Sequence, residues 1–147
     1  MLKLILTLVF AATIPTMAEA QSRALESTEA ARKASDGIIA ALAADSSSSA
    51  LKELRPLSVI PSADFDVFEA QFNSQQQNLL RQFGNPSGYE FLREDKLGSR
   101  LIRYQFLVFH EKAPLRWNIV FYKSEKGWVI SHFAFDGNAI GFFPGGA

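Results

Sequence analysis

The pattern of apolar and polar positions changes its period once along the chain, near residue 89. Before this point, apolar residues recur at helical spacing in three segments. The first segment runs from about Ser22 to Ala44, and the second is short and ends before Pro56. The third ends at residues 84–86, with the sequence Gly-Asn-Pro. The pattern therefore predicts three helices in the N-terminal half.

One polar residue interrupts the apolar stripe of the third predicted helix. Gln76 lies between Phe72 and Leu79 on that stripe, where another apolar residue would be natural. A polar group that faces a core costs free energy unless it is hydrogen-bonded. Gln76 therefore lies at the edge of the stripe or bonds a neighbour, or else it faces a cavity. If Gln76 faces a cavity, it is a candidate for lining a ligand pocket.

Beyond residue 89, apolar and polar positions alternate, as is typical of strands. Four strands follow from the alternation: Tyr89–Glu94, Leu101–His110, Leu115–Lys123 and Trp128–Phe135. Short connections rich in turn residues separate them, so neighbouring strands should pair in an antiparallel meander. The predicted fold class is α+β, with three N-terminal helices packed on a curved four-stranded sheet.

The two faces of the predicted sheet differ in character. If the central hairpin pairs His110 with Leu115, the apolar residues of both strands fall on one inner face. Val108 then lies opposite Trp117, which is expected to be a core residue between that valine and Phe135. The outer face is half polar, as on an open sheet or in a wet dimer contact.

The last predicted strand has a break in its alternation at Ser131-His132. On a regular strand, Phe133 would face away from the apolar residues that precede it. One extra residue restores a common inner face, so a β-bulge is expected there, with His132 on the outer face near Val120. Residues four apart on a regular strand are about 13 Å apart, so His132 and Asp136 should not form a catalytic pair.

The first twenty residues have the features of a cleavable signal peptide. Lys3 precedes an apolar run too short to span a bilayer, and Ala18-Glu19-Ala20 fits the small-x-small cleavage pattern. No cysteine stands near this point, so a lipid anchor is not expected, and the protein should be periplasmic or secreted. The expected organisation is a signal peptide over residues 1–20, one domain over residues 21–137 and an irregular tail over residues 138–147.

The composition excludes several classes of chemistry. Cysteine is absent, which removes thiolate metal sites, and the two histidines lack the spacing of a zinc protease, so no metal or cofactor is expected. Nucleophile-elbow, phosphate-loop and dinucleotide motifs are missing too. With 15 basic and 15 acidic residues, the chain gives no electrostatic argument for nucleic acid. No membrane contact is expected after the signal peptide is removed.

Segments of the strand half are similar to secreted bacterial members of the nuclear transport factor 2-like superfamily. The similarity rests on Arg103-Tyr104, Leu115-Arg116-Trp117 and the Gly127-Trp128 entry to the last strand, within residues 24–136. It implies a cone, with helices closing over the concave face of the sheet. The superfamily includes ketosteroid isomerases, scytalone dehydratase and polyketide cyclases, as well as members that only bind ligands or partners. None of the enzymes' catalytic motifs matches residue by residue, so no catalytic residue is assigned.

Two functions from different classes therefore remain. The first is a non-catalytic module that holds a small apolar ligand in the cone, or a partner such as a second copy on the outer face. The second is a lyase or isomerase that acts on a small hydrophobic substrate by acid–base catalysis, with His110 as the best candidate residue. The ligand-pocket candidates are Gln76, Tyr104, His110, Trp117, Phe121 and Phe135. The candidates for outer-face interactions are Arg103, Arg116, Tyr122 and His132. We favour the non-catalytic module because the inner face is mostly hydrocarbon, and an interior filled by aromatic side chains would favour a partner.

Overall fold

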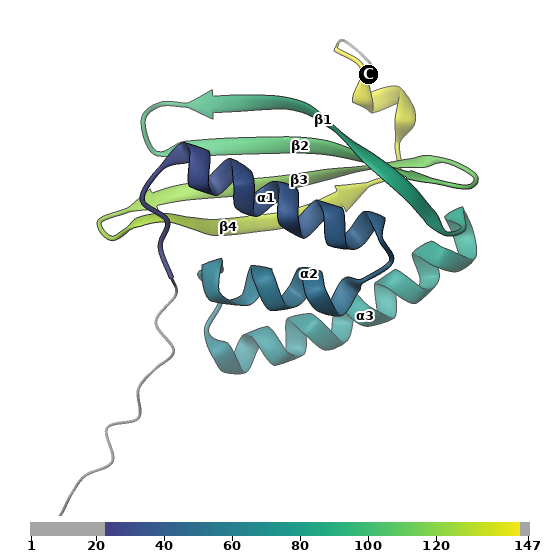
Figure 1. Ribbon diagram of the computed structural model, residues 1–147, viewed down its shortest axis with the longest axis horizontal. Helices are drawn as coiled ribbons and strands as arrows, with labels where there is room; N and C mark the ends of the chain where they lie inside the picture. Colours follow the sequence, from purple (N-terminus) through teal and green to yellow (C-terminus); the bar gives the residue numbers. More distant parts are fainter. Residues whose placement is uncertain (1–22, 145–147) are drawn as a thin grey trace, which may run out of the picture.

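The computed structural model of the chain describes residues 23–144 (Figure 1). The helices are α1 (Thr28–Ala43), α2 (Ser47–Leu54) and α3 (Ser62–Phe83). The strands are β1 (Pro86–Leu97), β2 (Leu101–His110), β3 (Pro114–Ser124) and β4 (Gly127–Asp136). The short 3₁₀ segments η1 (Arg55–Leu57) and η2 (Ala139–Phe142) follow α2 and β4. Within this part of the chain, no helix has the length and apolar character to cross a membrane. The expected signal peptide lies outside the described residues.

The strands form one open antiparallel sheet in the order β1-β2-β3-β4. This order confirms the predicted meander, and the helices before it confirm the α+β class. α1 contacts three of the four strands, and an aromatic residue of α3 packs on β3. We call the sheet face beneath these helices the inner face.

α1 begins later than the predicted start at Ser22. The Ser27 side chain caps the helix by accepting a hydrogen bond from the Ala30 amide at 3.1 Å. Leu25 instead pairs with Trp128 of β4 through two backbone hydrogen bonds of 2.8 Å. Helix propensity is a weak preference, so this strand-like pairing overrides the helical composition of the segment.

The core fills the space between the helices and the inner face. Trp117 is 2% exposed, which agrees with its predicted place in the core. Its ring lies 6.1 Å from the ring of Phe72 on α3 and 4.9 Å from that of Phe135 on β4. On β2, Phe106 rather than the expected Val108 lies beside it. The largest buried side chains include Trp117, Tyr104, Phe65, Phe106, Phe121, Ile38 and Ile39. Aromatic rings therefore join the helices to the sheet.

The register of the β2–β3 hairpin was predicted wrongly. Phe109 pairs with Pro114, a shift of two residues from the predicted pairing of His110 with Leu115. The end of α3 holds the connection in this position, since His110 Nδ1 lies 2.8 Å from the carbonyl oxygen of Gly84. A shift of two residues leaves every side chain on its own face, so the hydrophobic pattern cannot distinguish the two registers.

The β-bulge expected in β4 is present. Val120 pairs with His132, whereas the next residue, Phe121, pairs with Ile130, so Ser131 is the extra residue. His132 is exposed on the outer face, as expected, and the phenylalanines that follow it pair with inner-face residues of β3. The bulge therefore corrects the phase of the strand.

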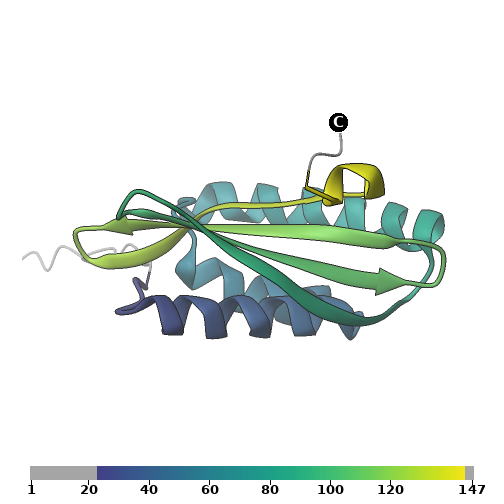
Figure 2. The ribbon, with the colours of Figure 1, turned by 90° about the horizontal axis from the view of Figure 1, so that it is seen from above.

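The tail after β4 folds back over the sheet in part. Arg116 of β3 donates to the carbonyl oxygen of Gly141 at 2.9 Å, and its guanidinium lies 4.8 Å from the centre of the Phe142 ring. Figure 2 shows η2 on the side of the sheet away from α1. Ile140 and Phe143 remain 70% and 72% exposed. The tail thus presents two apolar side chains that the described part of the chain leaves uncovered.

Candidate functional site on the open face of the sheet

The candidate site is the sheet face opposite the inner face, which we call the outer face. Among the described elements, η2 lies over part of the outer face, above Arg116 (Figure 2). From β1 and β2 it carries Glu90, Arg93, Asp95, Leu97, Leu101, Arg103, Gln105, Leu107 and Phe109. From β3 and β4 it carries Arg116, Asn118, Val120, Tyr122, Val129, His132, Ala134 and Asp136. The structure thus brings the four outer-face candidates, Arg103, Arg116, Tyr122 and His132, onto one surface.

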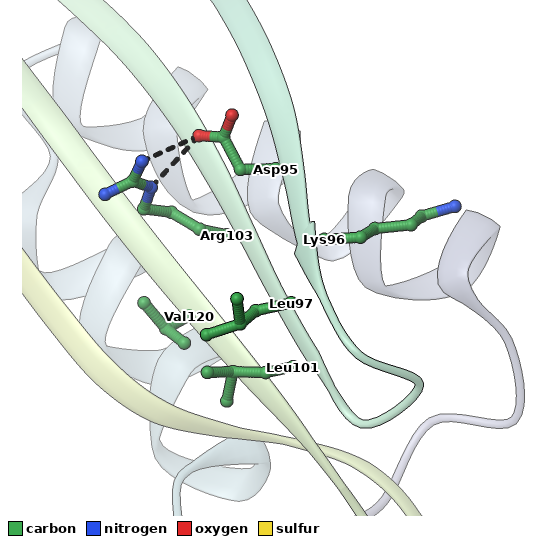
Figure 3. A pocket seen from close by; sticks show the side chains of 6 residues that line it. All are labelled: Asp95, Lys96, Leu97, Leu101, Arg103 and Val120. Carbon is green, nitrogen blue, oxygen red and sulfur yellow. Dashed lines mark hydrogen bonds and ion pairs between the residues drawn. The ribbon is translucent and has the colours of Figure 1, made fainter.

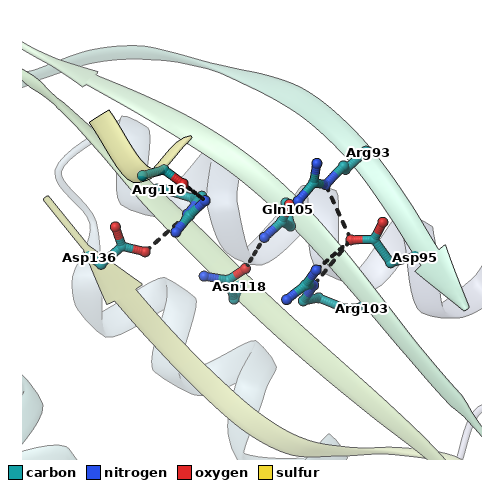
Figure 4. Close-up of polar contacts among 8 residues, drawn as sticks. Arg93, Asp95, Arg103, Gln105, Arg116, Asn118 and Asp136 are labelled. Atoms are coloured by element: carbon teal, nitrogen blue, oxygen red, sulfur yellow. Dashed lines mark hydrogen bonds and ion pairs between the residues drawn. The ribbon is translucent and has the colours of Figure 1, made fainter. Parts of the chain in front are cut away.

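An amide pair lies at the centre of the outer face (Figure 4). Gln105 Nε2 donates to Asn118 Oδ1 at 2.6 Å, from β2 to β3. Gln105 is only 2% exposed, so the side chains around it hold it in place. An amide carries both donors and an acceptor, so this pair suits partner groups of either kind.

A single carboxylate oxygen organises the end of the face near the β1–β2 connection (Figure 4). Asp95 Oδ2 accepts hydrogen bonds from Arg103 Nη2 at 2.8 Å and Nε at 3.1 Å. The same oxygen lies 3.2 Å from Arg93 Nε. Exposed ion pairs of this kind contribute little to stability. One carboxylate between two guanidinium groups leaves a local positive charge that a partner's acceptor can meet.

A second ion pair orders the opposite end of the face. Arg116 Nε donates to Asp136 Oδ2 at 3.0 Å, and Arg116 also binds the tail at Gly141. Asp136 Oδ1 is buried and has no hydrogen-bond partner among the described residues. The pair therefore fixes the tail against β3 and β4.

A hollow of about 300 Å³ lies at the Asp95 end of the outer face (Figure 3). It is lined by Asp95, Lys96, Leu97, Leu101, Arg103 and Val120. Leucine and valine side chains form its walls, and the ion pair of Asp95 with Arg103 lies at one end, while the Lys96 side chain points away (Figure 3). This volume is at the lower limit for small-molecule pockets.

Exposed apolar side chains stand at both ends of the outer face. Leu97, which lines the hollow, is 74% exposed. Tyr122, which pairs with Leu101 of the same hollow, is also exposed. Phe109 is exposed at the other end, where the tail adds Ile140 and Phe143. Single exposed apolar residues are normal on a protein surface. Aromatic residues such as Tyr122 and Phe109 are enriched at interaction sites.

The ligand-pocket candidates lie on the inner side, where packing holds most of them. Tyr104, Trp117 and Phe121 are buried, and the ring of Phe135 packs at a tilt against that of Trp117. The Tyr104 hydroxyl donates to the carbonyl oxygen of Thr28 at 2.9 Å. Burial raises the pKa of Tyr104 to about 12. Tyr104 is therefore neutral near pH 7, and its hydroxyl helps to hold α1 on the sheet.

The remaining two pocket candidates are His110 and Gln76. His110 is half-buried at the end of the sheet, against the carbonyl oxygen of Gly84. Gln76 Nε2 is buried without a hydrogen-bond partner within residues 23–144, as is Trp117 Nε1. Because Phe72, one turn before Gln76, packs on Trp117, both nitrogens belong to the layer between α3 and the sheet. They would suit a hydrogen-bond acceptor placed there. Over residues 23–144, no three His, Asp or Glu side chains gather as metal ligands would.

The carboxylates that fix the outer-face arginines were not predicted from the sequence. Asp136 could have been paired with Arg116 from the predicted alignment of the last two strands, because opposite charges stabilise facing positions. Asp95 could not be paired with Arg103 in this way. The alignment of β1 with β2 is shifted by an irregularity before Arg93, which its sequence pattern does not reveal.

Comparisons with known proteins add little to this description. No family model matches the chain. No curated protein matches it either. Among solved structures, the chain is similar to a DUF4783 family protein from Bacteroides uniformis, with 11% sequence identity and a TM-score of 0.35. The match covers 48% of this chain and 63% of that protein, so it spans less than two thirds of its length. A similarity of this size supports no functional argument and does not assign the chain to the nuclear transport factor 2-like superfamily.

Proposed function

We propose that the protein is an exported, non-catalytic interaction module that binds a protein partner through the outer face. The observation that carries this proposal is an ordered polar centre flanked by exposed apolar side chains on one surface. Arginine and tyrosine, both present on this surface, are enriched among the residues that dominate binding energy. Because ion pairs already order the arginines, binding costs less side-chain entropy.

The inner side supports packing more than catalysis. A lyase or isomerase needs an acid or base that faces a cavity. His110 Nδ1 lies against a backbone oxygen, and Tyr104 is committed to Thr28. An interior filled by packed aromatic rings agrees with the partner-binding role expected for a filled cone.

A small ligand is the second candidate, and two buried nitrogens favour it. Trp117 Nε1 and Gln76 Nε2 lack acceptors among the described residues. A buried donor without an acceptor is costly, so a bound molecule or water with an acceptor oxygen would stabilise the fold. The ligand would be apolar, with one acceptor group, and would lie between α3 and the sheet.

We extend the proposal to the family and the compartment. Three helices before a four-stranded meander support a cone of the nuclear transport factor 2-like superfamily (Figure 1). The residues Ala18-Glu19-Ala20 after an apolar run support export to the periplasm or the exterior. The domain would then act free of the membrane.

Photo-crosslinking in the exporting cell tests the proposed surface. A photoreactive phenylalanine analogue replaces Tyr122 on the outer face, and the same analogue at Asn73, on the exposed side of α3, serves as the control. We expect a covalent adduct with a protein from Tyr122 and none from Asn73. Equal adducts from both positions would show that the capture is not specific to the outer face.

Native mass spectrometry of protein from the same cells distinguishes the two candidates. An interaction module should carry no stoichiometric small molecule. A retained small molecule, together with no adduct from Tyr122, would replace the interaction module by the ligand-binding function. No adduct and no ligand would contradict both.

A further inference from the structure

We propose that a groove between α1 and α2 binds a short peptide segment with acidic and apolar side chains. The groove is lined by residues of α1, α2, η1 and the segment before α1. It lies on the helical side of the molecule and is separate from the outer face. The inference is therefore independent of the proposed function and adds a second binding surface.

The groove is long and open enough to accept an extended chain. α1 and α2 lie side by side (Figure 1), and the groove between them has a volume of about 810 Å³. The helices come close at Gly37, where a Cβ atom would lie only 2.5 Å from Glu53 Oε2. From Ala30 to Gly37, α1 lines about 10 Å of the groove, at about 1.5 Å per residue. An extended peptide at about 3.3 Å per residue covers this length with three or four residues.

Apolar side chains line part of the groove. Leu57 is only 6% exposed, and Leu25, Ala30 and Ala34 of the same lining are partly buried. The two alanines are short, so a side chain of the peptide can enter between the helices. Burial of an apolar side chain at this place would contribute to binding.

Three exposed cations line the same groove. Arg23, Lys33 and Lys52 form no ion pair within residues 23–144, whereas the arginines of the outer face are paired with carboxylates. The Arg23 amide donates to the carbonyl oxygen of Pro56, which holds this residue beside η1. The three cations and the carboxylate of Glu53 give the lining a net charge of +2. Carboxylates of a peptide would therefore meet positive charge that is not already balanced.

The charges around the groove favour a peptide over a membrane surface. Lys33 also lines a neighbouring hollow, together with Glu29 and Asp36, so carboxylates border the positive charge on α1. An anionic bilayer attracts clusters of cations over a broad surface and would meet these carboxylates as well. A single peptide chain can enter the groove without reaching them.

Fluorescence anisotropy with a synthetic peptide tests the groove. The probe is a fluorescein-labelled hexapeptide of alternating glutamate and leucine, and the protein is the chain without residues 1–20, which keeps every described residue. We expect binding that weakens as salt is added, because salt screens exposed charges. Peptides with glutamine in place of glutamate, or serine in place of leucine, should have dissociation constants at least about tenfold higher.

Charge variants of the protein locate the binding site. Lys33→Glu with Lys52→Glu should raise the dissociation constant of the glutamate peptide at least about tenfold, because the lining loses its net positive charge. Glu53→Gln should lower it, because the carboxylate of the lining is removed, and damage to the fold would not produce tighter binding. Arg100→Glu with Lys112→Glu makes the same change in net charge at exposed positions outside the groove and should leave it unchanged. Circular dichroism checks that each variant is folded.

Each other outcome overturns the inference at an identifiable step. Absence of binding, or equal binding of the glutamate and glutamine peptides, would exclude recognition of acidic side chains. Equal effects of the two double charge reversals would show a general attraction and not a site in the groove. Sedimentation of the protein with phosphatidylglycerol vesicles, without binding of the peptide, would replace the peptide by a membrane surface. None of these results bears on the outer face, which adducts from Tyr122 test separately.

Discussion

Two buried nitrogen atoms, Gln76 Nε2 and Trp117 Nε1, lie in the layer between α3 and the sheet without an acceptor among residues 23–144. A buried donor that lacks an acceptor costs about 1–3 kcal/mol. An acceptor on a bound water or ligand removes this cost. The stability of variants at these residues therefore reports whether that layer is occupied.

Replacing Gln76 by leucine removes the amide and keeps an apolar side chain of similar length. We expect Gln76→Leu to raise the free energy of unfolding by about 1 kcal/mol, because a buried donor without an acceptor is lost. Gln77→Leu, at the exposed neighbouring position, should change it by less than about 0.5 kcal/mol. Urea unfolding measures both. A clear loss of stability in Gln76→Leu would show that its nitrogen has an acceptor and would favour the ligand-binding candidate.

The buried hydroxyl of Tyr104 predicts a loss of stability at high pH. The pKa of Tyr104 is raised from 10.0 to about 12 in the fold, chiefly by burial. The fold therefore favours the protonated tyrosine. This contribution is complete below pH 10 and is lost as the pH rises towards 12.

Tyrosinate absorbance and urea unfolding as a function of pH measure the effect. Of the three tyrosines, Tyr104 should titrate last, and Tyr104→Phe should remove both the last step and its share of the stability decline. Tyr122→Phe, at an exposed position, should leave that step in place. If the last step persists in Tyr104→Phe, the hydroxyl is not buried as described.

Among the elements, β4 is the strand in which one extra residue corrects the facing of the side chains. Deleting Ser131 and His132 together would place Phe133 directly after Ile130 and would turn Phe133 and Phe135 towards the outer face. We expect this double deletion to prevent folding, because two large rings would leave the core at about 3–5 kcal/mol each. Deleting Ser131 alone removes the extra residue and leaves Ile130, Phe133 and Phe135 in regular alternation on the inner face, so that variant should fold. Circular dichroism and thermal unfolding compare the two. A double-deletion variant as stable as the single-deletion variant would show that the number of residues after Ile130 does not set the phase of β4.

Much of the element structure could be predicted because it follows from period and phase. The bulge at Ser131 was visible because a slip of one residue exchanges the faces of a strand. The register at His110 was not visible, because a shift of two residues preserves them. Leu25 was assigned to a helix by its neighbours, whereas its backbone pairs with β4. That pairing joins segments far apart in the chain, which local pattern does not report.

The candidate site could be predicted only in part, for a related reason. Alternation placed Arg103, Arg116 and Tyr122 on the outer face, since facing depends on parity alone, and the predicted bulge placed His132 there. The residues that these side chains contact depend on the register between strands and on where the tail folds back over the sheet. The hollow beside Val120 and the contact between Arg116 and η2 arise where separate segments meet. A pattern read along one strand contains neither.

For the molecule as a whole, the proposed export predicts a defined N-terminus of the mature protein. The described domain begins at Arg23, whose backbone amide donates to the carbonyl oxygen of Pro56, so cleavage after Ala20 would leave the described domain intact. N-terminal sequencing of the exported protein should begin at Gln21. Leucine in place of Ala18 and Ala20 should block cleavage, because signal peptidase needs small residues at these positions. An intact Met1 in exported protein would contradict the prediction.

The strand order also has a consequence for folding kinetics. Each strand pairs with the next one in sequence across a short connection, and hairpins of this kind close in about 1–10 μs. Contacts distant in sequence form more slowly. These are the bridges from Leu25 to Trp128 and from Ser58 to Ile130, both of which need β4. During synthesis or translocation β4 emerges after the other three strands, so the N-terminal half cannot complete its backbone pairing until β4 is available. Without cysteines, no oxidation step follows, and the bridges to β4 are expected to set the rate at which the chain becomes native.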